Sequence, residues 1–298
     1  MRDAKLLNYL HVHLLVFIAG FTAILGELIT IDAIALVWFR MLMATVLMYG
    51  YIYIKGISIK IPPKDIARLS VAGIIIALHW ITFFAAIKVS NISILLSMVS
   101  SGAFFASILE PIILKRKIIK YEMVFGSLVI FGVVLITQSE LEYIEGILLG
   151  ILSAFLAALF AVLNGKYVKQ FRPSVISIYE FISGVIFITI FILIYGSGFS
   201  QEFFILKTSD WWYLFILASV CTAYAFIASV KVMEYISPYT VMLTFNLEPV
   251  YGIILAVILF PETEKMSTNF YYGAAIILGA VLLNGIIKNW NALKRKQS

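Results

Sequence analysis

Ten runs of mostly apolar residues, separated by short polar joints, make up most of this chain of 298 residues. A helix needs about 20 apolar residues to cross the hydrocarbon core of a bilayer, and each run is close to that length. With 62% hydrophobic and 13% charged residues, the chain is too apolar for a soluble protein. We therefore predict an all-α integral membrane protein with ten transmembrane helices, over residues 9–29, 32–54, 66–88, 91–114, 120–138, 145–167, 174–196, 211–233, 239–260 and 268–289.

The basic residues gather at alternate joints between these runs. Lysine and arginine cluster before the first run, in the second, fourth and sixth joints and after the last run, whereas the intervening joints are mostly acidic. Loops rich in basic residues stay in the cytoplasm, so we expect both termini there. This topology accounts for the net charge of +6. We therefore expect the chain to bind the lipid bilayer and no nucleic acid.

The two halves of the chain repeat one pattern. A shift of 147 positions places Ser101 on Glu248 and Gly126 on Gly273. Each half holds five helices, and because five is odd, the second half crosses the membrane in the opposite sense, which makes the repeats inverted. We predict a first repeat over 9–138, an acidic periplasmic linker over 139–145, a second repeat over 146–287 and a basic cytoplasmic tail over 288–298.

A polar stripe crosses the ninth apolar run. Thr240, Thr244, Glu248 and Tyr251 fall on one helix face, and Pro249 lacks the N–H that a continuous helix requires, so we expect a kink. Hydrocarbon offers polar groups no partner, so the stripe should face protein or a water-filled cavity. Glu248 is the main candidate for binding a substrate amine or exchanging a proton. The alternative is a structural acid held by an internal partner.

The equivalent stripe in the fourth run consists of hydroxyl residues, among them Ser97 and Ser101. Small hydroxyl residues either bind a ligand or let helices pack closely, and packing is the better interpretation for each one alone. The stripe as a set favours a cavity. We therefore predict that the fourth and ninth helices face each other across a substrate cavity, with Tyr224 and Tyr251 as candidate aromatic walls.

Further polar residues lie inside other runs. A shift of 140 positions overlays Glu180 on Arg40, and their opposite charges suggest electrostatic coupling across the halves, as a structural ion pair, a gate or a substrate contact. His79, beside Trp80, is a candidate for relaying protons or binding a carboxylate, since imidazole titrates near neutrality. A lone histidine is just as often a packing residue.

Several motifs resemble the EamA family of the drug/metabolite transporter superfamily. They are WFRMLMA (38–44), AIKVSNISILLSMVSS (86–101), the glycine patterns GSLVIFG (126–132) and GAAIILG (273–279), and TFNLEPVYGIILAVILFPE (244–262). The resemblance implies a ten-helix carrier of a small-molecule substrate, such as an amino acid, drug or nucleoside, often acting outward across the bacterial inner membrane. One departure is the sequence SSG (100–102), where the family commonly has a proline.

The other function classes are an intramembrane enzyme and a membrane sensor or scaffold. An enzyme needs a nucleophile with a base, paired acids or a metal cluster, and Cys221 has no histidine near it in sequence. His11 and His13 stand two residues apart and do not share a helix face, so we expect no metal site. A sensor should carry a soluble effector domain, and we expect none in this chain. We expect no enzymatic activity and no cofactor, and proton coupling is an option for the carrier.

Overall fold

The computed structural model describes residues 2–115, 117, 119–196, 198–232, 244–245 and 247–297, and the regular elements in this part of the chain are all helical. The α-helices are α1 (Arg2–Leu28), α2 (Ala33–Ile54), α3 (Pro63–Val89), α4 (Ile92–Val99), α5 (Gly102–Leu114), α6 (Lys120–Ser139), α7 (Ile144–Tyr167), α8 (Pro173–Tyr195), α9 (Thr208–Ala218), α10 (Ala225–Val232), α12 (Glu248–Leu259) and α13 (Thr268–Gln297). Short helical turns are η1 (Leu141–Tyr143), η2 (Gln201–Phe204) and the π-helical η3 (Ser219–Tyr224).

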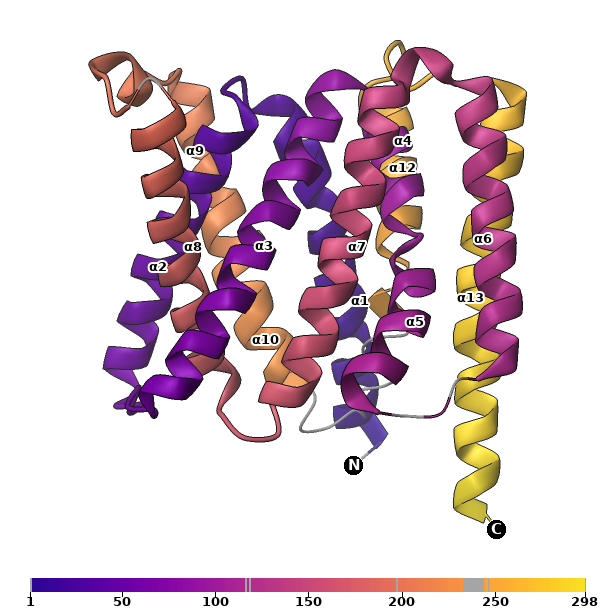
Figure 1. Ribbon diagram of the computed structural model, residues 1–298, viewed down its shortest axis with the longest axis horizontal. Helices are drawn as coiled ribbons and strands as arrows, with labels where there is room; N and C mark the ends of the chain where they lie inside the picture. Colours follow the sequence, from indigo (N-terminus) through magenta and orange to yellow (C-terminus); the bar gives the residue numbers. More distant parts are fainter. Residues whose placement is uncertain are drawn as a thin grey trace.

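Nine segments of the described chain are long and apolar enough to cross a membrane, and α12 is a shorter apolar helix within the ninth predicted run. Part of that run, including Thr240, lies outside the described residues. Each of the ten predicted runs therefore holds a helical segment of a multi-pass membrane protein. Figure 1 shows both ends of the chain on the same side of the bundle.

The predicted ends were too short for the first and last helices. α1 starts at Arg2 rather than at residue 9, and α13 continues to Gln297 rather than stopping at 289. The added residues are rich in leucine, alanine, lysine and arginine, which favour helix in water as well as in lipid. Elsewhere local signals set the start: the Asp32 side chain caps α2 by accepting two backbone N–H groups at 2.9 and 3.1 Å.

The fourth run does not form the continuous helix that we predicted. It breaks into α4 and α5 at Ser100 and Ser101. The Ser100 hydroxyl donates to the Leu96 carbonyl at 2.8 Å, and the Ser101 N–H donates to the Met98 carbonyl at 2.9 Å, three residues back. This tighter turn replaces the regular α-helical bond. The SSG sequence thus interrupts the helix without a proline.

The eighth run is interrupted too, by the π-helical turn η3 between α9 and α10. Within it, the Thr222 hydroxyl donates to the Leu217 carbonyl, five residues back, at 2.7 Å. Such turns insert an extra residue into a helix and often lie at functional sites. Here the turn changes which side chains of the eighth run point into the bundle.

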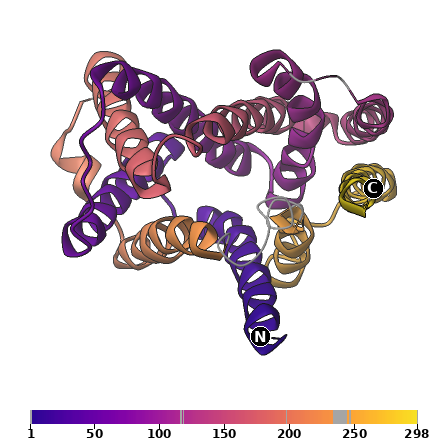
Figure 2. The ribbon, with the colours of Figure 1, turned by 90° about the horizontal axis from the view of Figure 1, so that it is seen from below.

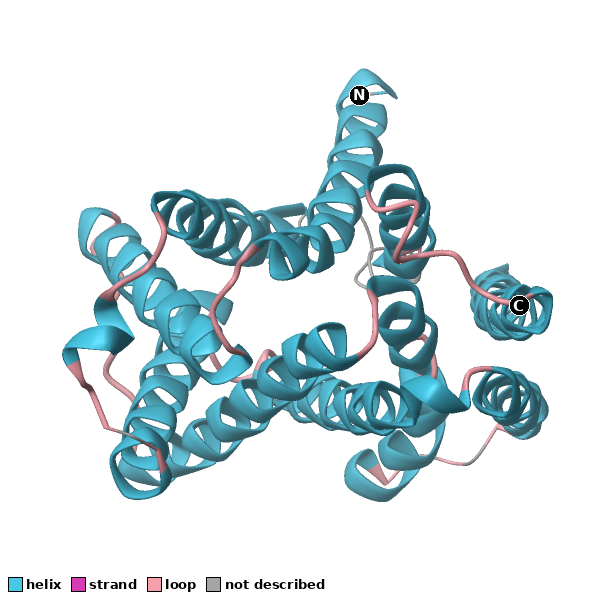
Figure 3. Cartoon of the chain, turned by 90° about the horizontal axis from the view of Figure 1, so that it is seen from above, coloured by secondary structure: helices cyan, strands magenta, loops and turns pink. Residues whose placement is uncertain are grey.

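The packing of the helices has a two-fold pattern. Helix α2 packs on α8, α4 on α12 and α6 on α13, and in each pair the two helices hold equivalent positions in the two halves. Helix α3 packs on α7 and α8, and correspondingly the α9–α10 segment packs on α1 and α2. Exchanging the halves therefore maps the first three contacts onto themselves and the contacts of α3 onto those of the α9–α10 segment. Figures 2 and 3 show α13, which carries the C terminus, with α6 beside it at the edge of the bundle.

Two glycines allow the close approach of α6 and α13. A Cβ atom on Gly132 would lie 2.8 Å from the Gly273 carbonyl oxygen, and one on Gly273 would lie 2.8 Å from the Gly132 oxygen. Each would also meet an isoleucine of the other helix, Ile277 and Ile136 respectively, at 2.6 Å. The contact is therefore reciprocal, although it joins Gly132 to Gly273 rather than the glycines that the shift of 147 positions pairs.

Candidate functional site

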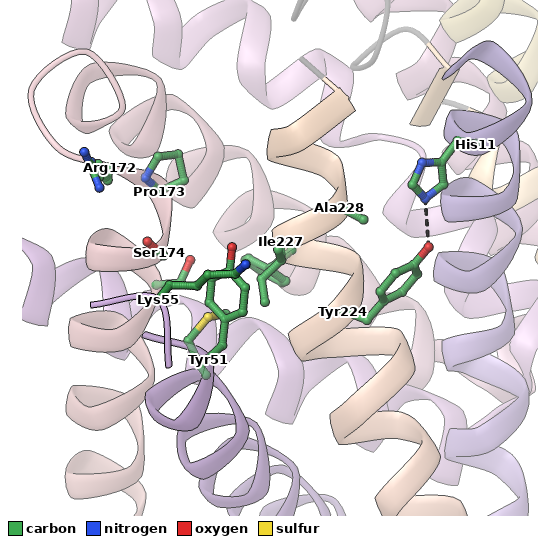
Figure 4. A pocket seen from close by; sticks show the side chains of 12 residues that line it. His11, Tyr51, Lys55, Arg172, Pro173, Ser174, Tyr224, Ile227 and Ala228 are labelled. Carbon is green, nitrogen blue, oxygen red and sulfur yellow. Dashed lines mark hydrogen bonds between the residues drawn. The ribbon is translucent and has the colours of Figure 1, made fainter. Parts of the chain in front are cut away.

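A cavity of about 710 Å³ opens between α1, α2, α8 and α10 on the side of the bundle that carries the termini. The end of α2 and the start of α8 form its rim, and the η3–α10 segment forms its inner wall. Figure 4 shows the side chains that line it. They are His11, Met48, Tyr51, Lys55, Arg172, Pro173, Ser174, Ser177, Tyr224, Phe226, Ile227 and Ala228.

The polar lining of this cavity is basic and aromatic. Lys55 and Arg172 are its cations, and no acidic residue is among the described residues that line it. His11 Nε2 and the Tyr224 hydroxyl are hydrogen-bonded at 2.8 Å, which joins α1 to η3 at one side of the cavity (Figure 4). In the other histidine of α1, His13, the Nδ1 atom is hydrogen-bonded to the Tyr251 hydroxyl at 3.3 Å. The cavity therefore favours ligands with anionic or aromatic groups.

Only Tyr224 among the predicted substrate residues lines this cavity within the described chain. The sequence analysis used Lys55 and Arg172 for topology alone. A signal was nevertheless present in α2, where Met48, Tyr51 and Lys55 follow Arg40 at helical spacing and so share its face. The convergence of this face with α8 and α10 depends on the tertiary packing.

Arg40 is buried inside the bundle, with 3% of its surface exposed. Its Nε donates to the Thr222 hydroxyl of η3 at 2.9 Å, and its Cζ lies 4.0 Å from the centre of the Trp80 ring. A guanidinium over an indole face is a favourable cation–π arrangement. The Trp80 ring therefore stabilises the charged guanidinium of Arg40 in this structure.

Glu180 is also buried, with 1% exposed, but it lies away from Arg40. It accepts a hydrogen bond from Asn164 Nδ2 of α7 at 2.8 Å, and its backbone packs on Gly73 of α3. No ion pair joins Glu180 to Arg40 in the part of the chain that the structure describes. No ion pair or hydrogen bond joins Glu248 to Arg40 in the described chain either.

His79 is held by the neighbouring helix α7. Its Nδ1 lies 2.9 Å from the Ser153 hydroxyl and 3.0 Å from the Ser153 carbonyl oxygen. This pairing fits the packing interpretation of a lone histidine. His79 and Trp80 are adjacent in sequence but contact different helices: His79 binds Ser153 of α7, and Trp80 packs on Arg40 of α2.

The fourth and ninth runs lie side by side, as α4 and α12. A Cβ atom on Gly252 would lie 2.3 Å from the Leu96 side chain, so the two helices touch closely. Ser97 is fully buried and Ser101 nearly so, and their hydroxyls have no hydrogen-bond partner among the described residues. Glu248 is partly exposed at the start of α12, and the Thr244 carbonyl accepts the Leu247 N–H at 3.0 Å.

The end of the bundle opposite the termini is tied by buried acids that the sequence analysis assigned to loops. Glu264 accepts the backbone N–H groups of Ile92 and Ser93 at 2.9 and 2.8 Å, which holds the α12–α13 loop on the start of α4. Asp210 at the start of α9 binds the α1–α2 joint, and Glu140 accepts the Ser267 N–H at 3.1 Å. The contacts of Glu264 and Asp210 join one half of the chain to the other, and the contact of Glu140 joins the linker between the halves to the second half.

The sequence matches the EamA-like transporter family twice, over residues 7–138 and over residues 144–286. The chain belongs to the EamA-like transporter family. EamA proteins are membrane transporters of the drug/metabolite transporter superfamily, and they are not enzymes. The two matches place the ties made by Asp210 and Glu264 between the two EamA segments, whereas Glu140 lies between the matched ranges and binds the second segment at Ser267.

A solved crystal structure of another protein has the same fold as this EamA chain. The two superpose with a TM-score of 0.62 over 96% of this chain and 98% of the other. Their sequences are 12% identical, so the likeness concerns the fold alone. No curated protein matches the sequence significantly.

Proposed function

We propose that this EamA protein is a secondary transporter that moves small metabolites, such as amino acids or related compounds, out of the cell across the bacterial inner membrane by alternating access. The observation that carries the proposal is the contrast between the two ends of the bundle. One end holds a cavity of about 710 Å³, and the other is tied across the two halves by buried acids. A carrier that is open on one side and closed on the other has this arrangement.

The two-fold packing pattern supports inverted repeats as the moving parts. Because α2–α8, α4–α12 and α6–α13 each join equivalent helices of the two halves, the halves can rock against each other around these contacts. In the opposite state of the carrier, the end that is now closed is open and the end that now holds the cavity is closed. The ties at Asp210, Glu264 and Glu140 must break, and the cavity between α2, α8 and α10 must close.

The loop charges support a cytoplasmic position for both termini and therefore a cavity that opens to the cytoplasm. An exporter loads its substrate from that side. Lys55 and Arg172 at the rim meet the substrate first, and Tyr224 and His11 contact it at the cavity wall. We assign deeper substrate contacts or gating roles to the predicted residues Glu248, Thr244, Tyr251, Ser97, Ser101, His79, Trp80, Arg40 and Glu180.

The test is uptake by the purified, full-length protein in liposomes, measured for a panel of amino acids, nucleosides and amines. At least one compound should enter faster than it enters protein-free liposomes, and excess unlabelled compound should compete with it. The same compound should raise the unfolding temperature of the detergent-solubilised protein, because a ligand that binds the folded state stabilises it. Absence of carrier-dependent uptake for every compound would exclude the proposed substrate classes.

A further inference from the structure

Arg40 has hydrogen-bonding capacity that the described residues do not use. Its Nε binds Thr222, but Nη1 is buried and has no partner among the described residues. An arginine stays charged in proteins, and its planar fork is suited to binding a carboxylate through two hydrogen bonds. A buried cation with a free donor inside a membrane bundle is costly unless an anion satisfies it.

The two intramembrane acids that we considered as partners of Arg40 do not supply that anion. Glu180 is bound to Asn164 on α7, and neither an ion pair nor a hydrogen bond joins Glu248 to Arg40 in the described chain. The groups around the guanidinium in the described chain are neutral: Thr222 on one edge, the Trp80 ring on one face, and the Phe84 ring, whose centre lies 5.6 Å from Cζ. Among the described residues, Nη1 of Arg40 is therefore available to a ligand.

Arg40 lies at the inner end of the helix face that lines the cavity. Lys55, Tyr51 and Met48 line the cavity from the rim inward, and Arg40 continues the same face of α2, 15 positions before Lys55. At 1.5 Å per residue this face spans roughly 22 Å. Thr222, which binds Arg40, is two residues from the cavity-lining Tyr224 on the same π-helical turn. One face of α2 therefore carries Lys55 at the rim of the cavity and Arg40 in the interior of the bundle.

Aromatic side chains separate the cavity from Arg40 in this state. Phe226 lines the cavity and packs edge-on against Phe181, with ring centres 5.4 Å apart. Phe181 in turn lies 5.9 Å from Trp80, which supports Arg40. Rotation of the Phe226 and Phe181 rings, which make no hydrogen bonds, would open a path toward Trp80 and Arg40.

We propose that Arg40 binds the carboxylate of the transported compound, through Nη1, after the compound has passed the basic rim of the cavity. This inference rests on the proposed transport function and narrows its substrate class to compounds that carry a carboxylate. Arg40 is then the residue that determines specificity for the acid. Glu248, which is partly exposed at the start of α12, is our candidate for binding an ammonium group elsewhere on the same compound.

The test compares matched compounds in liposomes that contain the full-length protein. Each set consists of an L-amino acid, its carboxamide and the amine that lacks the carboxyl group, for aromatic, aliphatic and basic side chains. The acid of at least one set should be transported, and its carboxamide and amine should compete roughly ten- to hundredfold more weakly, as expected for loss of a charged hydrogen bond. Equal competition by acid, amide and amine would overturn the inference while leaving transport itself intact.

Variants of the protein then test which residue is responsible for the preference for the acid. Arg40→Gln should remove the preference for the acid over its amide, and Arg40→Lys, which keeps the charge but not the fork, should retain part of it. Arg68→Gln is the matched control, because Arg68 is exposed and pairs with Asp65.

Retention of the full preference in folded Arg40→Gln protein would reject the role of Arg40. If that variant does not fold, the comparison of acid, amide and amine on the unaltered protein still decides. Transport of no compound in any set would reject the narrowed substrate class.

Discussion

The Asp210 carboxylate accepts both the backbone N–H and the side-chain hydroxyl of Thr30, at 2.9 and 2.8 Å. Asp210 is fully buried at the start of α9, and Thr30 lies in the joint between α1 and α2. The contact therefore links the two EamA segments at the end of the bundle that is closed. Transport by alternating access requires this link to break and re-form.

Removing the Asp210 carboxylate should destabilise this state. Asp210→Ala leaves two donors of Thr30 without their acceptor, which we expect to cost about 1–3 kcal/mol in the free energy of unfolding. Thr30→Val removes one donor and should cost less. Because the residues touch, the two effects should not be additive in the double variant. Thermal unfolding of the purified variants measures this, and strict additivity would contradict the contact.

Glu264 should stabilise the start of α4. Its carboxylate accepts two backbone N–H groups there, as a helix-capping acid does. Glu264→Ala should lower the free energy of unfolding by about 1–2 kcal/mol, in the range of a lost cap. The exposed Glu262, two residues away, is the control. Equal melting temperatures for Glu264→Ala and Glu262→Ala would rule out the capping role.

The crossing of α6 and α13 should not tolerate a side chain. A Cβ atom at Gly273 would lie 2.8 Å from the Gly132 carbonyl oxygen, whereas one at Gly279 on the same helix would meet nothing within 4 Å. Gly273→Ala should therefore destabilise the protein by about 1–3 kcal/mol through overpacking. Gly279→Ala should not, since added helix propensity there favours folding. Equal stability of the two variants would place the crossing elsewhere.

The charges of the loops predict opposite labelling of two positions. In a Cys221→Ser background, cysteines replacing Lys117 and Glu142 should lie on opposite sides of the membrane, because they flank α6 at its two ends. In intact cells, an impermeant thiol reagent should label the cysteine at position 142 alone. Labelling of both positions, or of position 117 alone, would contradict cytoplasmic termini.

Neutralising Glu248 should change transport more than folding. Glu248→Gln preserves the shape of the side chain and removes its capacity to carry a charge. If this acid binds the substrate or exchanges a proton, uptake should fall, and the remaining uptake should depend less on pH. Glu262→Gln, outside the bundle interior, should leave both unchanged. Full uptake with an unaltered pH profile in Glu248→Gln would exclude a charged role for this residue.

Several local features of the fold were predictable because they depend on short stretches of chain. The apolar runs specify membrane helices, since each backbone polar group in lipid must be paired within its own helix. Proline starts α3 and α8, and Asp32 caps α2. The break at Ser100 and Ser101 was not predicted, because serine is compatible with a helix and competes for its carbonyls only in some settings.

The arrangement of the site was less predictable. The polar residues Arg40, Glu180 and His79 were identified from their place in apolar runs, and the structure finds them buried or half-buried. Their partners were not: Thr222, Asn164 and Ser153 lie 182, 16 and 74 positions away. The π-helical turn that turns Thr222 toward Arg40 leaves no pattern in the sequence.

The sequence by itself determined the membrane location, the family and the residues that carry charge into the bundle, because each depends on composition, period or motif. The tertiary structure alone decided which of those residues meet. It joined Arg40 to Thr222 and Trp80, separated it from Glu180, and placed the cavity between α1, α2, α8 and α10. The physical reason is that contacts across a helical bundle depend on the rotation and depth of each helix, which are set by close packing such as that of Gly73 on Glu180.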